Sequence, residues 1–343
     1  MPGEQPLAAW DFDLPEERIA RRPAPSRSGS RLMGLPLSGG APSHHRFTQL
    51  PTLLKPGDLL VANDAKVMAA RLAARRASGG AVELLLLSPG PGAIPALARP
   101  ARKLRRGEVL TLQGGDTAII TAEAQGGVVQ LELSSDPVQV MAQQGSLPLP
   151  PYLDRPADDQ DTDRYQTIFA GPLGAAAAPT AGLHFDQELL TALEAAGIGF
   201  VTITLQVGLG TFLPLRPEAL EAGRLHTEPY TIEAGAVERI EATRAASGRV
   251  IAVGTTSART LEAATPEGAR VPSPGAGVTD LFVQPGYTFR CIDGLITNLH
   301  LPRSSLLMLV AALVGRRRLL DAYAEAIQAD YRFYSYGDAM LLV

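Results

Sequence analysis

The chain has 343 residues, of which 45% are hydrophobic and 19% charged, and its formal net charge is −4. This is the composition of a globular protein of about two domains, and it excludes a low-complexity or disordered chain. The single cysteine, Cys291, excludes an internal disulfide and a zinc cluster of cysteines, and no pattern suggests a metal or a permanently bound cofactor. Without a signal-peptide pattern or an apolar run long enough to span a bilayer, we expect a cytoplasmic protein with no membrane partner.

The first segment, to about residue 72, mixes loop, helix and strand. Asp13, followed by Pro15, Glu16 and Glu17, predicts the capped start of a helix. Residues 58–62 predict a short apolar strand.

Basic residues form local clusters although the whole chain is acidic. Such clusters bind phosphate, but solvated faces explain them equally well. Two clusters are Arg18, Arg21, Arg22, Arg27 and Arg31, and Arg99, Arg102, Lys103, Arg105 and Arg106.

Residues 73–147 predict a small inserted antiparallel β-barrel domain. Short apolar runs at 81–87, 108–112, 117–121 and 128–133 are separated by glycine-rich turns, and no long helical period intervenes. We assign residues 1–72 and 148–343 to a larger domain of mixed α/β class.

The larger domain alternates helical and strand patterns after residue 148. Residues 186–196 and 234–247 have helical spacing, and 200–207 and 249–253 have strand patterns. Ser304 or Ser305 is expected to cap one final helix that runs beyond Arg318.

No standard nucleotide-binding or hydrolase motif is present. The chain lacks a GxxxxGK[ST] loop and a GxGxxG fingerprint after a strand, so a Rossmann-type methyltransferase or dehydrogenase is not supported. HExxH and GxSxG are also missing.

Several short segments instead carry polar side chains among apolar or glycine-rich neighbours, where ligand sites tend to lie. The proline-stiffened segment around Tyr152 and Arg155 is either a binding segment or a rigid linker. Thr180 and His184 precede a helix whose free N–H groups favour anions, although a lone histidine is more often structural. Such a site would handle a polar, nucleotide-like ligand.

Other polar segments are equally ambiguous when each is taken alone. Two glycines, Gly208 and Gly210, suggest close approach of backbone to a ligand. His226 and Glu228 lie two apart on a predicted strand and therefore share a face. The pair is either a base tuned to neutral pH or an ordinary surface ion pair. The hydroxyls before the helix near residue 255 suit an anion pocket or a plain helix cap. The remaining candidates are Thr255, Thr256, Ser257, Asn298, His300, Arg303, Tyr334 and Tyr336.

Taken in order, these segments resemble one family along nearly the whole chain. LPLPPYLDR, DRYQTIFA, GAAAAPTAGLHF, QVGLGTFLPL, HTEPY, IAVGTTSARTLEA and YRFYSYGDAMLL are similar to the signature stretches of S-adenosylmethionine:tRNA ribosyltransferase-isomerases. The 281–310 stretch, LFVQPGYTFRCIDGLITNLHLPRSSLLMLV, continues the match. Ala65 and Ser28 depart from the family pattern, which weakens a catalytic role for those two positions.

The resemblance implies an α/β domain with a small β-barrel and an unusual use of S-adenosylmethionine as co-substrate. The ribosyl group, not the methyl group, is transferred and isomerised onto 7-aminomethyl-7-deazaguanine at the wobble position of tRNA. The products are epoxyqueuosine in tRNA, adenine and methionine. The partner would be a tRNA with a GUN-type anticodon, and the family suggests a monomer.

The mechanism that the resemblance implies requires a base at the ribose carbon next to the sulfonium. His184, His226 and His300 are the candidates, with Glu228 or Asp338 to orient the base. Further hypotheses give each ligand group a partner: Arg303 for the methionine carboxylate, Thr255, Thr256 and Ser257 for ribose hydroxyls, Tyr334 or Tyr336 for the sulfonium or adenine, and Asp293 or Asp64 for the acceptor.

For tRNA we expect phosphate contacts from both basic clusters, at Arg22, Arg31, Arg102, Lys103 and Arg105. Two rival functions stay open from the residues alone: an S-adenosylmethionine-dependent tRNA methyltransferase, and a tRNA-binding protein without enzymatic activity. The products of the reaction distinguish the three.

Overall fold

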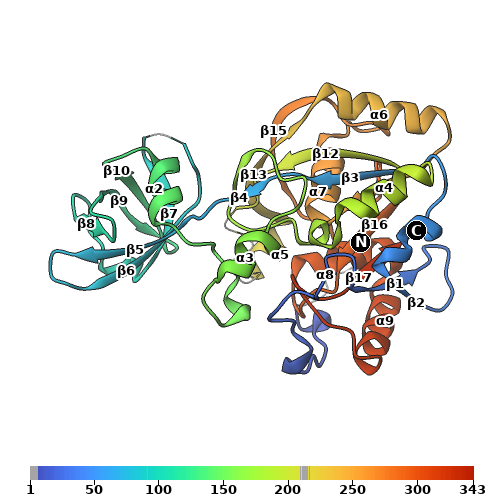
Figure 1. Ribbon diagram of the computed structural model, residues 1–343, viewed down its shortest axis with the longest axis horizontal. Coiled ribbons are helices and arrows are strands. Elements are labelled where there is room, and N and C mark those ends of the chain that lie inside the picture. The colour runs from blue at the N-terminus through green and yellow to red at the C-terminus, as the bar shows by residue number, and fades with distance from the viewer. Residues whose placement is uncertain (1–6, 91, 209, 211–214, 216) are drawn as a thin grey trace.

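The computed structural model describes residues 7–90, 92–208, 210, 215 and 217–343. A small domain of strands stands apart from a larger domain of mixed helices and strands, and extended segments join the two (Figure 1). This arrangement confirms the predicted fold class. The boundaries at residues 72/73 and 147/148 stay predictions.

Within the described residues, the larger domain contains one sheet of nine strands. Its order is β15 (Gly275–Leu281), β13 (Arg224–Ile232), β12 (Gly199–Leu205), β3 (Leu59–Asn63), β14 (Val250–Val253), β16 (Gly294–Asn298), β17 (Ala339–Leu342), β1 (Arg31–Leu35) and β2 (Ser43–Arg46). The neighbours β12, β3, β14 and β16 are parallel. Strands β3, β14 and β16 are fully buried, and their almost continuous apolar sequences are typical of a parallel sheet covered on both faces.

Helices cover both faces of this sheet because alternate side chains of a strand point to opposite sides. Leu59 and Val61 of β3 join the core beneath α6 (Ala234–Ala245), α7 (Thr255–Ala264), α8 (Ser305–Val314) and α9 (Arg316–Gln328). Leu60 and Ala62 join a second core with α4 (Gln187–Ala195) and α1 (Leu50–Leu53). The sheet therefore lies between two helical layers.

The small domain is a closed antiparallel barrel in the part of the chain that the structure describes. Its strand order is β10 (Val128–Leu133), β7 (Ile94–Arg99), β6 (Ala81–Leu86), β5 (Arg71–Arg76), β8 (Val109–Leu112) and β9 (Thr117–Gln125), and β9 pairs with β10 to close it. Strands β5 and β7 and helix α2 (Pro137–Gln144) have no counterpart in the sequence predictions. Strand β5, with the sequence RLAARR, alternates weakly because small alanines stand where larger apolar residues usually mark a strand.

Two predictions about helices are wrong. Instead of one C-terminal helix, Ser304 caps α8, and α9 starts only after Gly315, whose φ of 84° breaks the helix. Near the N-terminus, the predicted helix is a single 3₁₀ turn, Glu16–Arg18, preceded by Pro15 without a capping side chain.

The remaining elements join these layers. They include α3 (Asp159–Arg164), α5 (Pro217–Ala222), the short parallel pair β4 (Lys66–Val67) and β11 (Leu173–Ala175), and several 3₁₀ turns, one of them at Thr180–His184. Among the described residues, no helix is both long and apolar enough to cross a bilayer.

Candidate active site

A pocket opens at the carboxyl ends of the parallel strands β12, β14 and β16. It encloses about 750 Å³, including the space at its mouth. Ligands bind at this edge of α/β sheets because the loops that follow neighbouring parallel strands meet there. Seven residues singled out from the sequence line this active-site pocket: Thr180, Glu228, Thr255, Thr256, Asn298, His300 and Tyr334.

The N-terminus of helix α7 reaches the active-site pocket through Thr255 and Thr256. Gly254 precedes the helix with a φ of 90°, and no side chain caps the first turn. The first N–H groups of a helix have no partner within it, and together with the helix dipole they attract anions. In addition, the buried Oγ1 of Thr256 has no hydrogen-bond partner among the described residues.

Arg259 lies one helical turn beyond Thr255, on the wall of the same pocket. Its side chain is 8% exposed, and its Nη2 has no partner within the described part of the chain. An unpaired guanidinium nitrogen beside a free helix N-terminus forms a site for a carboxylate or a phosphate.

Glu228, on β13, balances the charge of Arg259. Its Oε2 accepts a hydrogen bond from Nη1 of Arg259 at 2.5 Å, and its Oε1 accepts from the backbone N–H of Gly208 at 2.9 Å. Because both side chains are buried, the pocket presents a fixed cation and a fixed anion side by side.

The described glycines of this segment, Gly208 and Gly210, lie against β13. A Cβ atom on Gly208 would lie 3.8 Å from Cγ of Glu228, and one on Gly210 would lie 3.7 Å from Cδ2 of His226. His226 itself is exposed and does not line the pocket. The next part of the motif, residues 211–214, lies outside the described residues.

Asn298, the last residue of β16, ties three segments together at the pocket wall. Its Oδ1 accepts from Thr180 Oγ1 at 3.2 Å, and its Nδ2 donates to the carbonyl of Tyr334 at 3.0 Å and to Nε2 of His184 at 3.2 Å. Nδ1 of His184 bonds to Ser30 Oγ at 2.7 Å, and burial lowers the pKa of His184 to about 3. His184 therefore stands behind Asn298, neutral and with both ring nitrogens engaged.

His300 is the histidine that lines the active-site pocket. Its Nε2 pairs with Thr297 Oγ1 at 2.8 Å, which fixes the orientation of the ring. Burial lowers the pKa of His300 to about 3, so the imidazole is neutral at pH 7.

Tyrosine side chains form the apolar side of the pocket. Tyr334 has a φ of 78°, a strained value for a bulky residue, and its ring meets that of Tyr152 edge-on with centroids 3.8 Å apart. Burial raises the pKa of Tyr334 to about 12. The hydroxyls of Tyr152 and Tyr165 are buried without a partner among the described residues.

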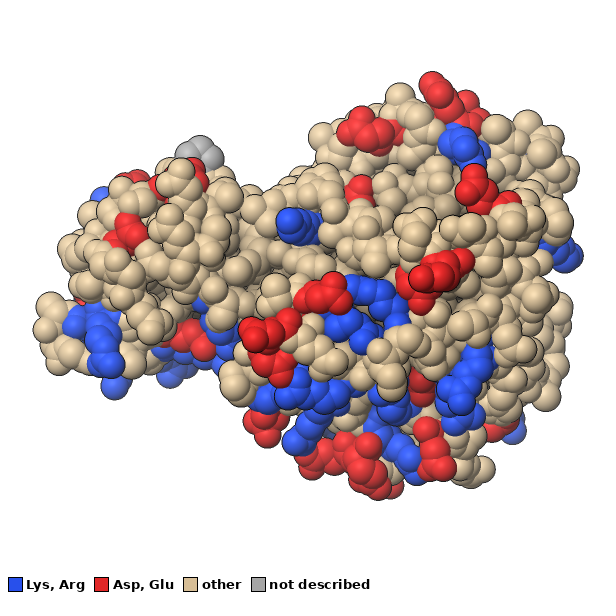
Figure 2. All heavy atoms as spheres, in the orientation of Figure 1, with Lys and Arg blue, Asp and Glu red and all other residues tan. Residues whose placement is uncertain are grey.

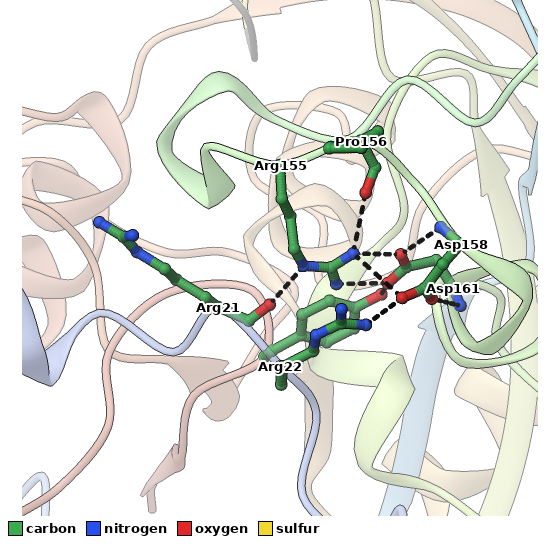
Figure 3. Close-up of polar contacts among 7 residues, drawn as sticks. Arg21, Arg22, Arg155, Pro156, Asp158 and Asp161 are labelled. Atoms are coloured by element: carbon green, nitrogen blue, oxygen red, sulfur yellow. Dashed lines mark hydrogen bonds and ion pairs between the residues drawn. The ribbon is translucent and has the colours of Figure 1, made fainter.

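Arg155 and Tyr336 lie away from the active-site pocket, in a buried network around Asp161. Arg155 makes a bidentate pair with Asp161 at 2.5 and 2.7 Å (Figure 3), and the hydroxyl of Tyr336 donates to the same carboxylate at 2.7 Å. Burial alone would raise the pKa of Asp161, but these hydrogen bonds outweigh it and hold the pKa well below its usual range. This network anchors the segment that follows Pro150.

Three charged candidates are engaged elsewhere. Asp338 accepts from the backbone N–H groups of Arg31 and Arg332, at 2.9 and 2.8 Å. Asp293 is paired with two arginines. Arg303 is exposed and paired with Asp11.

Two further candidates lie at the sheet edge without lining the pocket. Asp64, next after β3, accepts from Thr204 Oγ1 at 2.6 Å. Ser257 is fully buried and donates to the carbonyl of Val253 at 2.8 Å, which makes it a structural part of the first turn of α7.

The candidate tRNA contacts differ in their surroundings. Arg102, Lys103 and Arg105 are exposed on the barrel. Arg22 instead reaches Asp158 (Figure 3), and the guanidinium of Arg31 lies 3.8 Å above the ring of Tyr331. Lys and Arg side chains spread over the lower half of the larger domain, interleaved with Asp and Glu (Figure 2).

Sequence reasoning missed Arg259, Tyr165 and Ser335 as lining residues. Arg259 had one available signal, because it stands four residues after Thr255 on the same helix and therefore shares its face. Nothing in the local pattern marks Tyr165 or Ser335.

Among the described residues, no group of three or more His, Cys, Asp or Glu side chains is placed to hold a metal ion. The pocket, with its helix N-terminus and buried ion pair at the ends of parallel strands, defines an α/β enzyme that binds a charged small molecule.

Comparisons with known proteins identify the family. A family model described as "Queuosine biosynthesis protein" matches residues 7–342. The chain is 48% identical to the S-adenosylmethionine:tRNA ribosyltransferase-isomerase of Anaeromyxobacter sp. (strain K), over 98% of this chain and 99% of that one. It is 50% identical to the protein of that name from Gloeobacter violaceus, over 98% and 95% of the two chains.

A solved structure agrees with these matches. The crystal structure of the S-adenosylmethionine tRNA ribosyltransferase from Thermotoga maritima is similar over 98% of this chain and 100% of that chain, with a TM-score of 0.56 and 34% identity. The chain belongs to the queuosine biosynthesis protein family, whose curated relatives are named S-adenosylmethionine:tRNA ribosyltransferase-isomerases.

Proposed function

We propose that this enzyme transfers and isomerises the ribosyl group of S-adenosylmethionine onto 7-aminomethyl-7-deazaguanine at the tRNA wobble position. The products are epoxyqueuosine in tRNA, adenine and methionine. The observation that carries this proposal is the buried Glu228–Arg259 pair beside the uncapped N-terminus of α7.

This arrangement suits the zwitterionic end of S-adenosylmethionine. The carboxylate of the methionine moiety would bind the free N–H groups of α7 and Nη2 of Arg259, which has no partner among the described residues. Its ammonium group would bind Glu228. We therefore assign the carboxylate to Arg259 and not to Arg303, which is exposed and paired with Asp11.

The remaining parts of the co-substrate have partners in the same pocket. The ring of Tyr334 offers a π face to the positive sulfur. The hydroxyls of Thr180, Thr255 and Thr256 are candidates for the ribose, because all three line the pocket and Oγ1 of Thr256 has no partner in the part of the chain that the structure describes.

For the base we propose His300. Its neutral imidazole lines the pocket, whereas His184 is occupied at both nitrogens and His226 is exposed. In the proposed reaction His300 takes the proton from the ribose carbon next to the sulfonium. Adenine then leaves, the acceptor amine attacks the anomeric carbon, and closure of the epoxide expels methionine.

Fewer contacts support the assignment of residues that bind the acceptor base. Asp64 is the candidate for the ammonium of the acceptor, since it follows β3 at the same sheet edge and Asp293 is held by two arginines. We further propose a GUN-type anticodon, a monomeric enzyme and a cytoplasmic location. Sedimentation of the purified protein with and without tRNA tests the monomer.

The deciding experiment incubates the protein with S-adenosylmethionine and tRNA that carries 7-aminomethyl-7-deazaguanine. Free adenine together with epoxyqueuosine in the digested tRNA is the expected result. S-adenosylhomocysteine would indicate a methyltransferase. Binding without any product, next to a competent control enzyme, would indicate a tRNA-binding protein.

A further inference from the structure

A second, smaller pocket lies behind the active-site pocket. It measures about 250 Å³ when the open space at its mouth is included, and its polar lining includes Arg27, Arg164, Ser30 and His184. We call it the Arg164 pocket. Ser335 lines both pockets.

A single layer of side chains separates the two pockets. His184, on the wall of the Arg164 pocket, bonds to Asn298, on the wall of the active-site pocket, at 3.2 Å. A single ligand could therefore place its reactive part in the active-site pocket and a charged group in the Arg164 pocket.

The two arginines of this pocket are held differently. Arg27 donates to the carbonyls of Asp163 and Gln166, each at 2.8 Å, at the C-terminal end of α3. These bonds fix its guanidinium in place. Within the described residues, Arg164 makes one long hydrogen bond, 3.4 Å from Nη1 to the carbonyl of Pro25. Its buried Nε has no partner among the residues that the structure describes.

Arg164 also lacks a balancing carboxylate within ion-pair distance in the described part of the chain. The adjacent Asp163 is 79% exposed and lies 3.5 Å from Arg27, while Asp161 and Asp338 are engaged by Arg155 and Arg332. Burial, and then the like charge of Arg27, lower the pKa of Arg164. Two close guanidinium groups with too little negative charge around them form an incomplete ion cluster.

We propose that the Arg164 pocket binds one backbone phosphate of the tRNA, next to the nucleotide whose base enters the active-site pocket. The planar guanidinium fork matches a phosphate oxygen pair, and a bound phosphate supplies the missing negative charge. The proximity of the two pockets favours a phosphate joined to the reacting nucleotide. This inference rests on the proposed function for the identity of the acceptor.

The test uses an anticodon stem-loop with 7-aminomethyl-7-deazaguanine at the wobble position. One phosphate at a time around that nucleotide is replaced by a neutral methylphosphonate. Affinities are measured at fixed salt for the wild-type enzyme and for Arg164→Ala. We expect one position at which the neutral linkage weakens binding to the wild type about tenfold. At that position the same linkage should not weaken binding to Arg164→Ala further, because both changes remove the same charge-assisted contact.

Arg317→Ala is the matched control, because Arg317 is 95% exposed and far along the chain in α9. It should respond to every methylphosphonate as the wild type does. Arg164→Lys keeps the charge without the fork and should fall between the two. Circular dichroism of each variant establishes that it is folded, and Arg164→Lys keeps the test decisive if Arg164→Ala does not fold.

Additive losses at every position would overturn the proposal. A second outcome would also overturn it: inorganic phosphate binds the wild type but not Arg164→Ala, and no methylphosphonate position is coupled to Arg164. The pocket would then bind a free anion and not the tRNA backbone. Adenine release by the wild type is measured separately. If one phosphate is coupled to Arg164 but no adenine is released, the phosphate site is supported and the proposed reaction is refuted. If adenine is released but no phosphate is coupled to Arg164, the reaction is supported and the phosphate site is refuted.

Discussion

Glu228 and Arg259 form a buried ion pair, with 2.5 Å between Oε2 and Nη1, at the wall of the active-site pocket. The two residues come from different elements, β13 and α7, and both side chains are more than nine-tenths buried. Besides each other, Arg259 has the carbonyl of Leu281, which accepts from its Nε at 2.9 Å, and Glu228 has the backbone N–H of Gly208.

The first prediction concerns this pair. Arg259→Gln and Glu228→Gln should each destabilise the fold by about 3–5 kcal/mol, because each leaves a buried charge unpaired. The double variant should regain most of that stability, since both charges are gone. Binding of S-adenosylmethionine should nevertheless be lost in both variants that lack Arg259. Urea unfolding and calorimetric titration measure the two effects.

Arg303→Gln is the matched control for the carboxylate assignment. It removes an exposed arginine paired with Asp11, so stability should stay nearly unchanged, and affinity for S-adenosylmethionine should be retained. Lost binding in Arg303→Gln, with normal binding in the Glu228→Gln/Arg259→Gln double variant, would return the carboxylate to Arg303.

A second prediction concerns the base. His300→Ala should reduce adenine release by about 10²-fold or more, the usual contribution of a positioned proton acceptor, while tRNA affinity stays unchanged. His226→Ala should have little effect, because its side chain lies outside the pocket. Full activity in the His184, His226 and His300 alanine variants alike would exclude a histidine base.

Stability should depend on pH through the two buried histidines. Their pKa values are about 3 in the folded protein and 6.5 in the unfolded chain. Between these values the unfolded chain binds more protons, so the free energy of unfolding falls as the pH falls below about 6.5. Each histidine contributes a slope of up to about 1.4 kcal/mol per pH unit.

His184→Gln should remove one of these two slopes while other titrating groups stay the same. Urea unfolding at pH 7 and at pH 5 provides the comparison. An equal loss of stability in the wild type and the variant over this interval would mean that His184 is protonated in the folded protein.

A further prediction concerns the barrel. Replacing Arg102, Lys103 and Arg105 by glutamine should weaken tRNA binding and lower the slope of log affinity against log salt by about 2, since each phosphate contact contributes about 0.7–0.9. The affinity for S-adenosylmethionine should not change, because these side chains lie on the barrel surface. Wild-type tRNA affinity that is independent of salt would contradict the contacts.

The sequence alone determined the elements whose signals are local. The apolar run of β3, the glycine-separated strands of the barrel, the helix over 186–196 and the cap at Ser304 follow from side-chain period, turn residues and capping. The resemblance of the motifs, in order along nearly the whole chain, also indicated the family. The helix break at Gly315 was not predicted, because one glycine within a helical pattern does not reveal that its φ is positive.

Only the tertiary structure decided which polar residues share a pocket. Arg303 and Arg259 are both plausible anion ligands in the sequence, but one is exposed beside Asp11 and the other is buried beside Glu228. His184 and His300 differ likewise, since one stands behind Asn298 and the other lines the pocket. Burial and pairing depend on strands and helices that lie far apart in the chain, and local patterns do not encode which of these meet.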